Sequence, residues 1–555
     1  MSILRRSRLV FALLPVVLIS TIWGDTLSTV PLSCLYDPAG HPMLGLYGPY
    51  SMSREASGTS WQPDATPPQG IDWTKGNWQF MTDGFANGGY TNQLGPRGTD
   101  QGFTTSMLML NGERSFERDT VGFRAMASLD PLMGPKGYPE LLQTGETADG
   151  VTPLVDRQHP HNLLSELALT ENHQLTDDSS VFIYGGLPGE PALGPTAFMH
   201  RLSGEDNPMA PISHQWMDST HITYGVLTAG YILGDFKLEG SSFRGREPDQ
   251  NHWALEETPK LDSYSGRLSY NPTSQWSSQV SWGHLTSPEQ LFPSSHVNRA
   301  TASASYTRAW RDGWSATTFA WGRNWNQSYD TLDAALVESS LNIHNVHTFF
   351  TRFEYVQKDD LTPALPLNSL TGGLFSKDID YHPFFPLGAT APFTINIFGV
   401  EQWTLGYIYD FAQGNYAKWG IGASAALSFV PAALKPFYGS FPAAYTLFLR
   451  VKLGKGTSAP IPAASPSATP LSPAPAAPIT LVPQDQLGSY FEHCKPGTLL
   501  QVSLRNEKTF VAPFSSYDAV NDTVWFLNPS NSLFKTRGIR MEAITIVQPL
   551  QSSTK

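Results

Sequence analysis

The feature that most constrains this chain is a long series of segments, about ten residues each, in which apolar and polar side chains alternate. Trp403, Leu405 and Tyr407 share one face of such a segment, and Thr404 and Gly406 lie on the other. Because successive side chains of a β-strand point to opposite sides, each segment is predicted to be a strand with one apolar face. The same alternation recurs in segments 264–270, 300–307, 419–429 and 445–453.

Strands of this kind follow one another from residue 77 to residue 453. Short turns such as 233–235, 272–274 and 311–313 are predicted between some of them, and long connections at 130–178, 188–218, 247–260 and 358–394 are predicted as external loops or plugs. One strand is missing from the series, either in 130–215 or in 360–395, because bacterial barrels have even strand numbers, here about 14 or 16. The predicted strands are 77–87, 101–111, 119–129, 179–187, 219–233, 235–246, 261–271, 275–284, 298–310, 313–324, 334–341, 346–357, 395–410, 416–429 and 444–453.

Three features favour a transmembrane antiparallel β-barrel over a soluble all-β sandwich, which shows the same alternation. The less apolar faces carry Gly, Ser and Thr, which suit a crowded or watery lumen. The series is long for one sandwich. Aromatic girdles mark the membrane interfaces of such barrels, and here tryptophans recur near strand ends: Trp276, Trp282, Trp310, Trp314, Trp321, Trp325, Trp403 and Trp419. The predicted fold class is therefore all-β, with the barrel spanning residues 77–454.

The N-terminus has the pattern of a secretory signal. Arg5, Arg6 and Arg8 precede an apolar run from Leu9 to Trp23, which is short for a transmembrane helix. We predict a signal peptide over residues 1–28 and an irregular periplasmic segment over 29–76. An uncleaved anchor helix, or acylation of Cys34, are the alternatives.

A proline-rich linker and a small domain are predicted after the barrel. Residues 455–483 are rich in Pro, Ala and Ser, a composition that favours extended conformations. Residues 484–555 regain short apolar runs separated by turns, and their pattern resembles small SH3-like or Sm-like five-stranded barrels. We expect this domain to be periplasmic, with a cell-wall component or a periplasmic protein as its partner.

Charge and cysteine content exclude several classes of function. The net charge of −12 argues against a nucleic-acid partner, which usually meets a basic surface. The two cysteines, Cys34 and Cys494, lie too far apart in the sequence to indicate a disulfide framework or a cysteine zinc site. No nucleophile elbow, phosphate-binding loop or zinc-protease motif is present, so we do not expect an enzyme.

A cluster of histidines and methionines marks residues 156–221, which hold 6 of the 14 histidines of the chain. Imidazole and thioether ligands together suit copper. The alternative is a structural plug, in which Asp156, Arg157 and Arg201 form a polar network and the methionines fill gaps. The candidate metal ligands are His159, His161, Met199, His200, His214, Met217 and His221.

Charged side chains of both signs occupy the polar faces of several predicted strands. Lys237 and Glu239 alternate with Phe236 and Leu238, so we expect them to face the lumen. Charges in the lumen tune selectivity or lock a plugged barrel through ion pairs, and mixed signs on one strand favour locking. The complete set of predicted lumen residues is Lys237, Glu239, Arg267, Arg352 and Glu354.

Segments 199–230, 238–253 and 346–361 resemble uncharacterised porin-like outer-membrane proteins of bacteria. A looser similarity, through Met and His content alone, links the chain to copper-resistance outer-membrane proteins. The resemblance implies a barrel in contact with outer-membrane lipid, with no bound cofactor other than copper. The predicted function is a pore or plugged channel for small solutes, and the alternative is a copper-handling protein that uses its His- and Met-rich loop.

Overall fold

The computed structural model describes residues 45–255, 257–326, 331–359, 361, 397–454 and 491, together with five strands between 499 and 549. The chain divides into two compact units, residues 1–458 and 459–555. The predicted signal peptide, the whole predicted linker and both cysteines lie outside the described residues.

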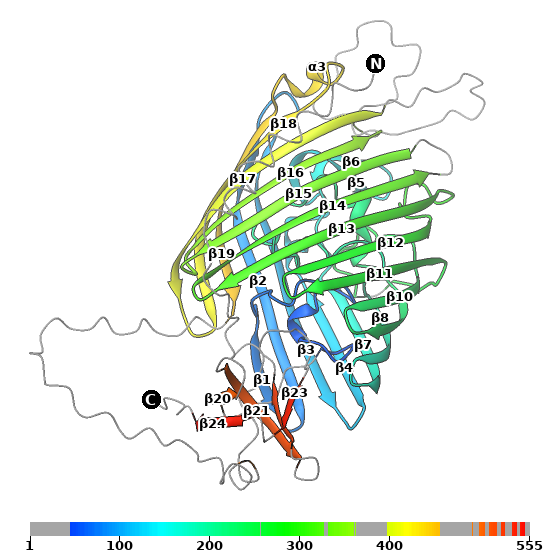
Figure 1. Ribbon diagram of the computed structural model, residues 1–555. Coiled ribbons are helices and arrows are strands. Elements are labelled where there is room, and N and C mark those ends of the chain that lie inside the picture. The colour runs from blue at the N-terminus through cyan, green and yellow to red at the C-terminus, as the bar shows by residue number, and fades with distance from the viewer. Residues whose placement is uncertain are drawn as a thin grey trace, which may run out of the picture. The chain divides into compact units, whose positions relative to one another are not determined.

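Sixteen antiparallel strands of the first unit close into a barrel, in which β19 pairs with β2 and joins the two ends of the sheet (Figure 1). A further strand, β1 (Ile71–Lys75), forms a hairpin with the beginning of β2. The barrel strands are β2 (Trp78–Gln93), β3 (Asp100–Ser115), β4 (Asp119–Ala127), β7 (Leu164–Thr176), β8 (Ser179–Gly186), β9 (Val226–Leu233), β10 (Phe236–Phe243), β11 (Ser263–Thr273), β12 (Trp276–Thr286), β13 (His296–Trp310), β14 (Gly313–Asn326), β15 (Thr331–Ile343), β16 (His347–Lys358), β17 (Phe398–Gln413), β18 (Ala417–Phe429) and β19 (Ala443–Leu453).

All fifteen predicted strands are present, and the missing sixteenth is β7. Two details of the prediction were wrong. The strand expected from residue 219 begins at Val226, because residues 219–221 form a buried 3-10 turn, η4 (Ser219–His221). Trp314 faces the interior with 8% exposure, on the same side of β14 as Ala316 and Ala320, so it cannot belong to an interfacial girdle.

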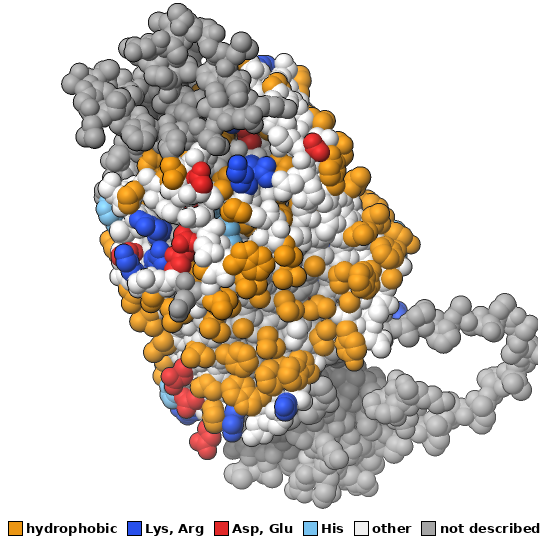
Figure 2. Space-filling model, turned by 180° about the vertical axis from the view of Figure 1, so that it is seen from behind, with side chains coloured by type: hydrophobic (Ala, Val, Ile, Leu, Met, Phe, Trp, Pro, Cys, Tyr) orange, Lys and Arg blue, Asp and Glu red, His pale blue; other side chains and the backbone are white. Residues whose placement is uncertain are grey.

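The outer wall of the barrel is apolar. Tyr407, Leu405 and Trp403 of β17 are exposed, whereas the residues between them point inward, as the alternation predicts. Figure 2 shows hydrophobic side chains in a broad band over one side of the wall, with charged side chains gathered above and below the band. A contiguous exposed apolar surface of this extent marks a barrel that is surrounded by lipid.

The two ends of the barrel differ in the length of their connections. Both barrel termini and seven short turns lie at one end, which we call the turn end; these turns comprise residues 116–118, 177–178, 234–235, 274–275, 311–312, 344–346 and 414–416. The longer connections lie at the other end, which we call the loop end. In bacterial barrels the short turns are periplasmic and the long loops extracellular. No helix among the described residues is long and apolar enough to cross a membrane.

The second unit contains a five-stranded antiparallel sheet with the order β23-β22-β21-β20-β24. Its strands are β20 (Leu499–Leu504), β21 (Phe510–Asp518), β22 (Thr523–Leu527), β23 (Thr536–Arg540) and β24 (Ile544–Pro549).

Candidate functional site

The candidate site is the interior of the barrel, which is filled by three parts of the chain. Residues 128–163 and 187–225 are connections at the loop end, and residues 45–69 precede β1 at the turn end. Nearly all residues of 187–225 are buried although the segment has little regular structure beyond α2 (His214–Met217) and η4. We call these three parts together the plug. Irregular backbone can be buried here because the polar wall supplies hydrogen-bond partners.

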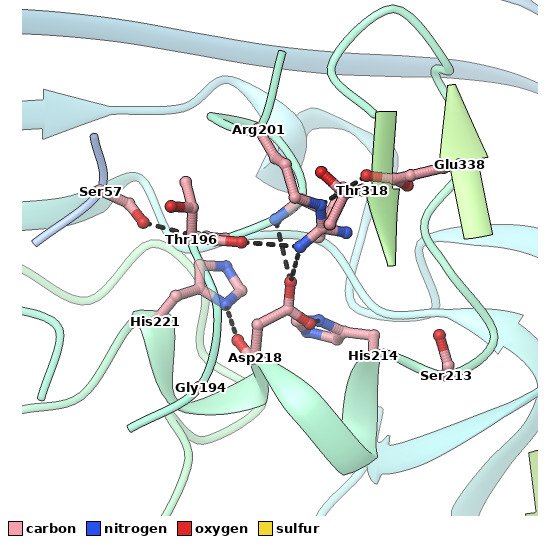
Figure 3. Close-up of polar contacts among 12 residues, drawn as sticks. Ser57, Gly194, Thr196, Arg201, Ser213, His214, Asp218, His221, Thr318 and Glu338 are labelled. Atoms are coloured by element: carbon pink, nitrogen blue, oxygen red, sulfur yellow. Dashed lines mark hydrogen bonds and ion pairs between the residues drawn. The ribbon is translucent and has the colours of Figure 1, made fainter. Parts of the chain in front are cut away.

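An ion-pair network ties residues 187–225 to the wall (Figure 3). Arg201 Nε donates to Glu338 Oε1 of β15 at 2.5 Å, and Ser203 Oγ donates to the same carboxylate oxygen at 2.9 Å. Arg201 Nη1 donates to the Thr196 carbonyl at 2.7 Å and contacts Asp218 Oδ2 at 3.3 Å. Arg201 and Glu338 are both nearly inaccessible, so their pairing is screened little by solvent.

A second network holds the same segment against β16. Arg352 Nη2 donates to the carbonyls of Met209 and Ala210 at 2.9 and 2.8 Å, and Arg352 Nε pairs with Glu354 at 3.0 Å. Glu354 Oε1 in turn accepts hydrogen bonds from the backbone and the hydroxyl of Ser213, at 3.0 and 2.7 Å.

The N-terminal part of the plug is held by β10 and β11. Lys237 Nζ donates to the Thr59 carbonyl, and the Thr59 hydroxyl donates to Glu239 at 2.5 Å. Arg267 pairs with Glu239 at 2.9 Å and donates to the Gly194 carbonyl at 3.0 Å. The structure therefore places residues 45–69 inside the lumen, whereas the sequence analysis placed 29–76 in the periplasm.

All five predicted lumen residues thus contact the plug, and each of them is buried. Other wall arginines that contact the plug were missed, among them Arg124 and Arg299. Arg124 Nη1 donates to the Gly58 carbonyl at 2.8 Å, and Arg299 Nη2 donates to the Gln215 carbonyl at 2.6 Å. The sequence could have identified both, because each arginine lies on the inward face of a strand with alternating side chains.

Cavities inside the barrel are small. One of about 10 Å³ lies beside Arg267 and Gly194, and one of about 20 Å³ lies beside His161 and Met199. A single water needs about 10–15 Å³ measured in this way. A wider cavity of about 70 Å³ lies at the turn end, beside Arg450 and Lys452. The first two spaces can hold water but not a solute molecule.

Three of the predicted metal ligands meet in the plug. The ring centroids of His161 and His221 are 5.3 Å apart, and those of His214 and His221 are 5.1 Å apart. The phenyl ring of Phe198 contacts all three imidazoles. His161 comes from residues 128–163 and the other two from 187–225, so the cluster joins two parts of the plug.

The Nδ1 atoms of this cluster are all occupied. His161 Nδ1 lies 2.8 Å from Asp130 Oδ2, and His214 Nδ1 lies 2.8 Å from Asp218 Oδ1. His221 Nδ1 lies 2.7 Å from the Asp218 carbonyl. The Nε2 atoms of His161 and His221 are buried without a hydrogen-bond partner. Burial, together with the neighbouring imidazoles, lowers the pKa of His221 well below its usual value, so this ring is neutral near pH 7.

The other predicted ligands lie outside this cluster. His159 stacks on His252 at 6.3 Å, a histidine that the sequence analysis did not select. Met199 packs among apolar residues such as Met107 and Phe198, and Met217 packs in the apolar cluster around Trp216. His200 is partly exposed, with its Nε2 buried and unpartnered. Among the described residues, no group of three or more His, Cys, Asp or Glu side chains could hold a metal ion.

Outer-membrane barrels are among the solved structures that resemble the chain. No family model and no curated protein matches the chain. An anion-selective porin from Comamonas acidovorans is 12% identical, with a TM-score of 0.40 over 68% of this chain and 99% of that one. Salmonella typhi OmpF, solved with daunomycin, is 9% identical, with a TM-score of 0.40 over 69% of this chain and 100% of that one. The outer-membrane channel DcaP of Acinetobacter baumannii is 10% identical, with a TM-score of 0.35 over 69% of this chain and 100% of that one. Similarity at this level gives no information about which solute passes through the barrel.

Proposed function

We propose that this protein is a channel of the bacterial outer membrane whose lumen is closed at rest by the plug, and that small polar solutes pass when the plug rearranges. The apolar outer wall, and the difference between short turns at one end and long loops at the other, support a location in the outer membrane. The observation that carries the closed state is the pairing of Arg201 of the plug with Glu338 of the wall inside the lumen.

Some of the contacts between plug and wall are of a kind that can be released. These are ion pairs and hydrogen bonds, with Glu338 and Arg352 on the wall and Arg201 on the plug. Wall and plug can exchange these partners for water when they separate. The rest of the contact is apolar, since Trp216 of the plug packs in one buried cluster with Leu332 and Leu336 of the wall.

Conductance across a planar bilayer tests the proposal. We expect wild-type protein to be almost silent, and the double variant Glu338→Ala, Glu354→Ala to show frequent openings, because it loses two wall carboxylates that hold residues 187–225. Asp333→Asn is the matched control, because Asp333 pairs with Arg323 on the outer side of the wall. Steady large conductance of the wild type would disprove closure by the plug, and silence of the double variant would disprove the channel.

A further inference from the structure

We infer that small carboxylate solutes bind to a basic patch on the inner wall at the turn end, where carboxylates of the plug lie at rest. The basic patch consists of Lys418 on β18 and of Arg450 and Lys452 on β19, and all three line the cavity of about 70 Å³. That the channel carries such solutes rests on the proposed function, whereas their binding can be measured without conductance.

The plug itself provides carboxylates to the basic patch. Glu205 and Asp206 are successive residues of segment 187–225. Arg450 Nη1 donates to Asp206, and Lys452 Nζ donates to Glu205 Oε1 at 2.5 Å. Hydrogen bonds between a cationic donor and a carboxylate are among the strongest that side chains form. The basic patch therefore recognises carboxylates, and in the closed channel it holds those of the chain.

Lys418 differs from the other two cations of the basic patch. Among the described residues it has no hydrogen bond or ion pair, and the carboxylates that attract it from farther away are Asp410 and Asp206. Arg450 already binds both of these carboxylates. Lys418 also lies directly opposite Lys452 in the sheet, and like charges in this position destabilise a pair of strands. A carboxylate bound at Lys418 would offset the repulsion.

Without the plug, cations outnumber anions at this place on the wall. Among the described residues of the wall, the carboxylates near the basic patch are Asp410, which Arg450 binds at 3.0 Å, and Asp83 on β2. Arg and Lys side chains that line a pore favour the passage of anions. When the plug shifts, Glu205 and Asp206 leave with it, so the basic patch becomes available to the carboxylate of a solute.

A solute carboxylate can enter the cavity beside the basic patch and compete with the plug. A water-sized atom needs about 10–15 Å³ of such space, so the cavity has room for about five non-hydrogen atoms, enough for acetate or propionate. Burial raises the pKa of Glu205 to about 7, so near neutral pH this carboxyl is partly protonated and holds Lys452 less firmly. An ionised solute carboxylate then binds Lys452 in its place.

The test supplies free carboxylates to a plug that has lost its own. The double variant Glu205→Ala, Asp206→Ala vacates the places of the two carboxylates, and the folded full-length protein in detergent is titrated with isotope-labelled acetate and propionate. Binding is measured by NMR. We expect the double variant to bind both anions at least tenfold more tightly than the wild type, whose own carboxylates occupy the basic patch. Acetamide, which has the shape of acetate without its charge, should not bind.

Further substitutions in the double variant locate the bound anion. Adding Lys418→Met and Lys452→Met should weaken acetate binding at least tenfold. Adding Lys435→Met is the matched control and should leave it unchanged, because Lys435 is exposed at the loop end in α3 (Lys435–Tyr438). The folded band on an unboiled gel verifies each variant. If the alanine variant does not fold, Glu205→Gln, Asp206→Asn takes its place, since it removes the charges and keeps the shape of the plug.

Three results would overturn the inference: no tighter binding of acetate by either double variant, equal binding of acetamide, or binding that survives the loss of both lysines. The channel and the basic patch can fail separately. A channel that never conducts, with a double variant that binds acetate, would overturn the channel alone. A conducting channel whose double variant does not bind acetate would overturn the basic patch alone.

Discussion

At the scale of single residues, the buried pair of Arg201 and Glu338 should contribute strongly to stability. Glu338→Gln keeps the shape of the side chain but removes the charge of the nearer of the two carboxylates beside the buried guanidinium, the other being Asp218. Breaking a buried pair from one side costs about 3–5 kcal/mol. We expect a clear fall in the temperature at which the folded band on an unboiled gel is lost.

The control for this prediction is Asp333→Asn. Its partner Arg323 is 38% exposed, and exposed pairs contribute about 0–1 kcal/mol. An equal fall in both variants would mean that the Arg201–Glu338 pair has no special role in holding the plug.

Predictions for single residues were correct where the alternation of inward and outward side chains along a strand decides the position. Lys237, Glu239 and Arg267 were assigned to the lumen because they alternate with apolar neighbours, and all three are buried there. This alternation gives no information about contacts between the segments that connect the strands. The stacking of His159 on His252 joins two of them that are separated by four strands, so no local pattern could have revealed it.

At the scale of elements, inward phenylalanines lie across glycines of neighbouring strands. Phe350 of β16 is opposite Gly406 of β17, and Phe448 of β19 is opposite Gly422 of β18. A Cβ added at Gly406 would lie 2.0 Å from the Phe350 ring. The glycine is therefore needed for the ring to lie flat on the sheet, as in the aromatic rescue of designed barrels.

We predict that Gly406→Ala destabilises the barrel by about 1–3 kcal/mol, the usual cost of overpacking. Gly266→Ala is the control, because a Cβ at Gly266 would be 3.6 Å from its nearest neighbour, an ordinary contact. Thermal loss of the folded band, compared between the two variants, measures the difference. Equal stability of the two variants would contradict the packing argument.

Strands were predictable where their outward face is uniformly apolar. β7 was missed because Leu167 and Leu169 on its outward face are followed by Glu171 and His173. These polar residues lie toward the turn end, where the wall leaves the apolar band. The beginning of β9 was misplaced for a different reason, since Ile222 and Tyr224 before Val226 are apolar and buried without belonging to a strand.

At the scale of the whole molecule, the plug combines parts of the chain that a sequence cannot bring together. Residues 45–69 enter at the turn end and contact 187–225 from the loop end; Ser57 Oγ accepts a hydrogen bond from the Ala197 amide at 2.9 Å. From the sequence, 187–225 has the glycines and prolines of a surface loop. Its burial depends on the barrel being wide enough to admit it, a property of all sixteen strands together.

The plug, together with the connection 244–262 that contacts it through His252, contains ionisable groups with opposite effects on the stability of the protein at low pH. Burial lowers the pKa of His200 to about 3 and that of His252 to about 4. The unfolded chain protonates these rings below about pH 6.5 and the folded chain does not, so their contribution to stability falls as the pH decreases from 6.5 toward 4. Burial raises the pKa of Glu190 to about 8 and that of Glu205 to about 7. The folded chain protonates these carboxyls first, so their contribution rises as the pH decreases from 8 toward 4.5.

Comparison of variants separates the two effects. Replacing His200 and His252 by Gln removes the two groups whose contribution to stability decreases in acid. The double variant should therefore gain stability relative to the wild type as the pH is lowered from 7 to 4.5. The gain should amount to a few kcal/mol, because one pKa unit corresponds to about 1.4 kcal/mol. His344→Gln serves as the control, since His344 is 72% exposed at a turn. Thermal loss of the folded band, measured at each pH, gives the comparison. If the difference between wild type and double variant were constant over this range, the buried histidines would not be what makes the plug sensitive to acid.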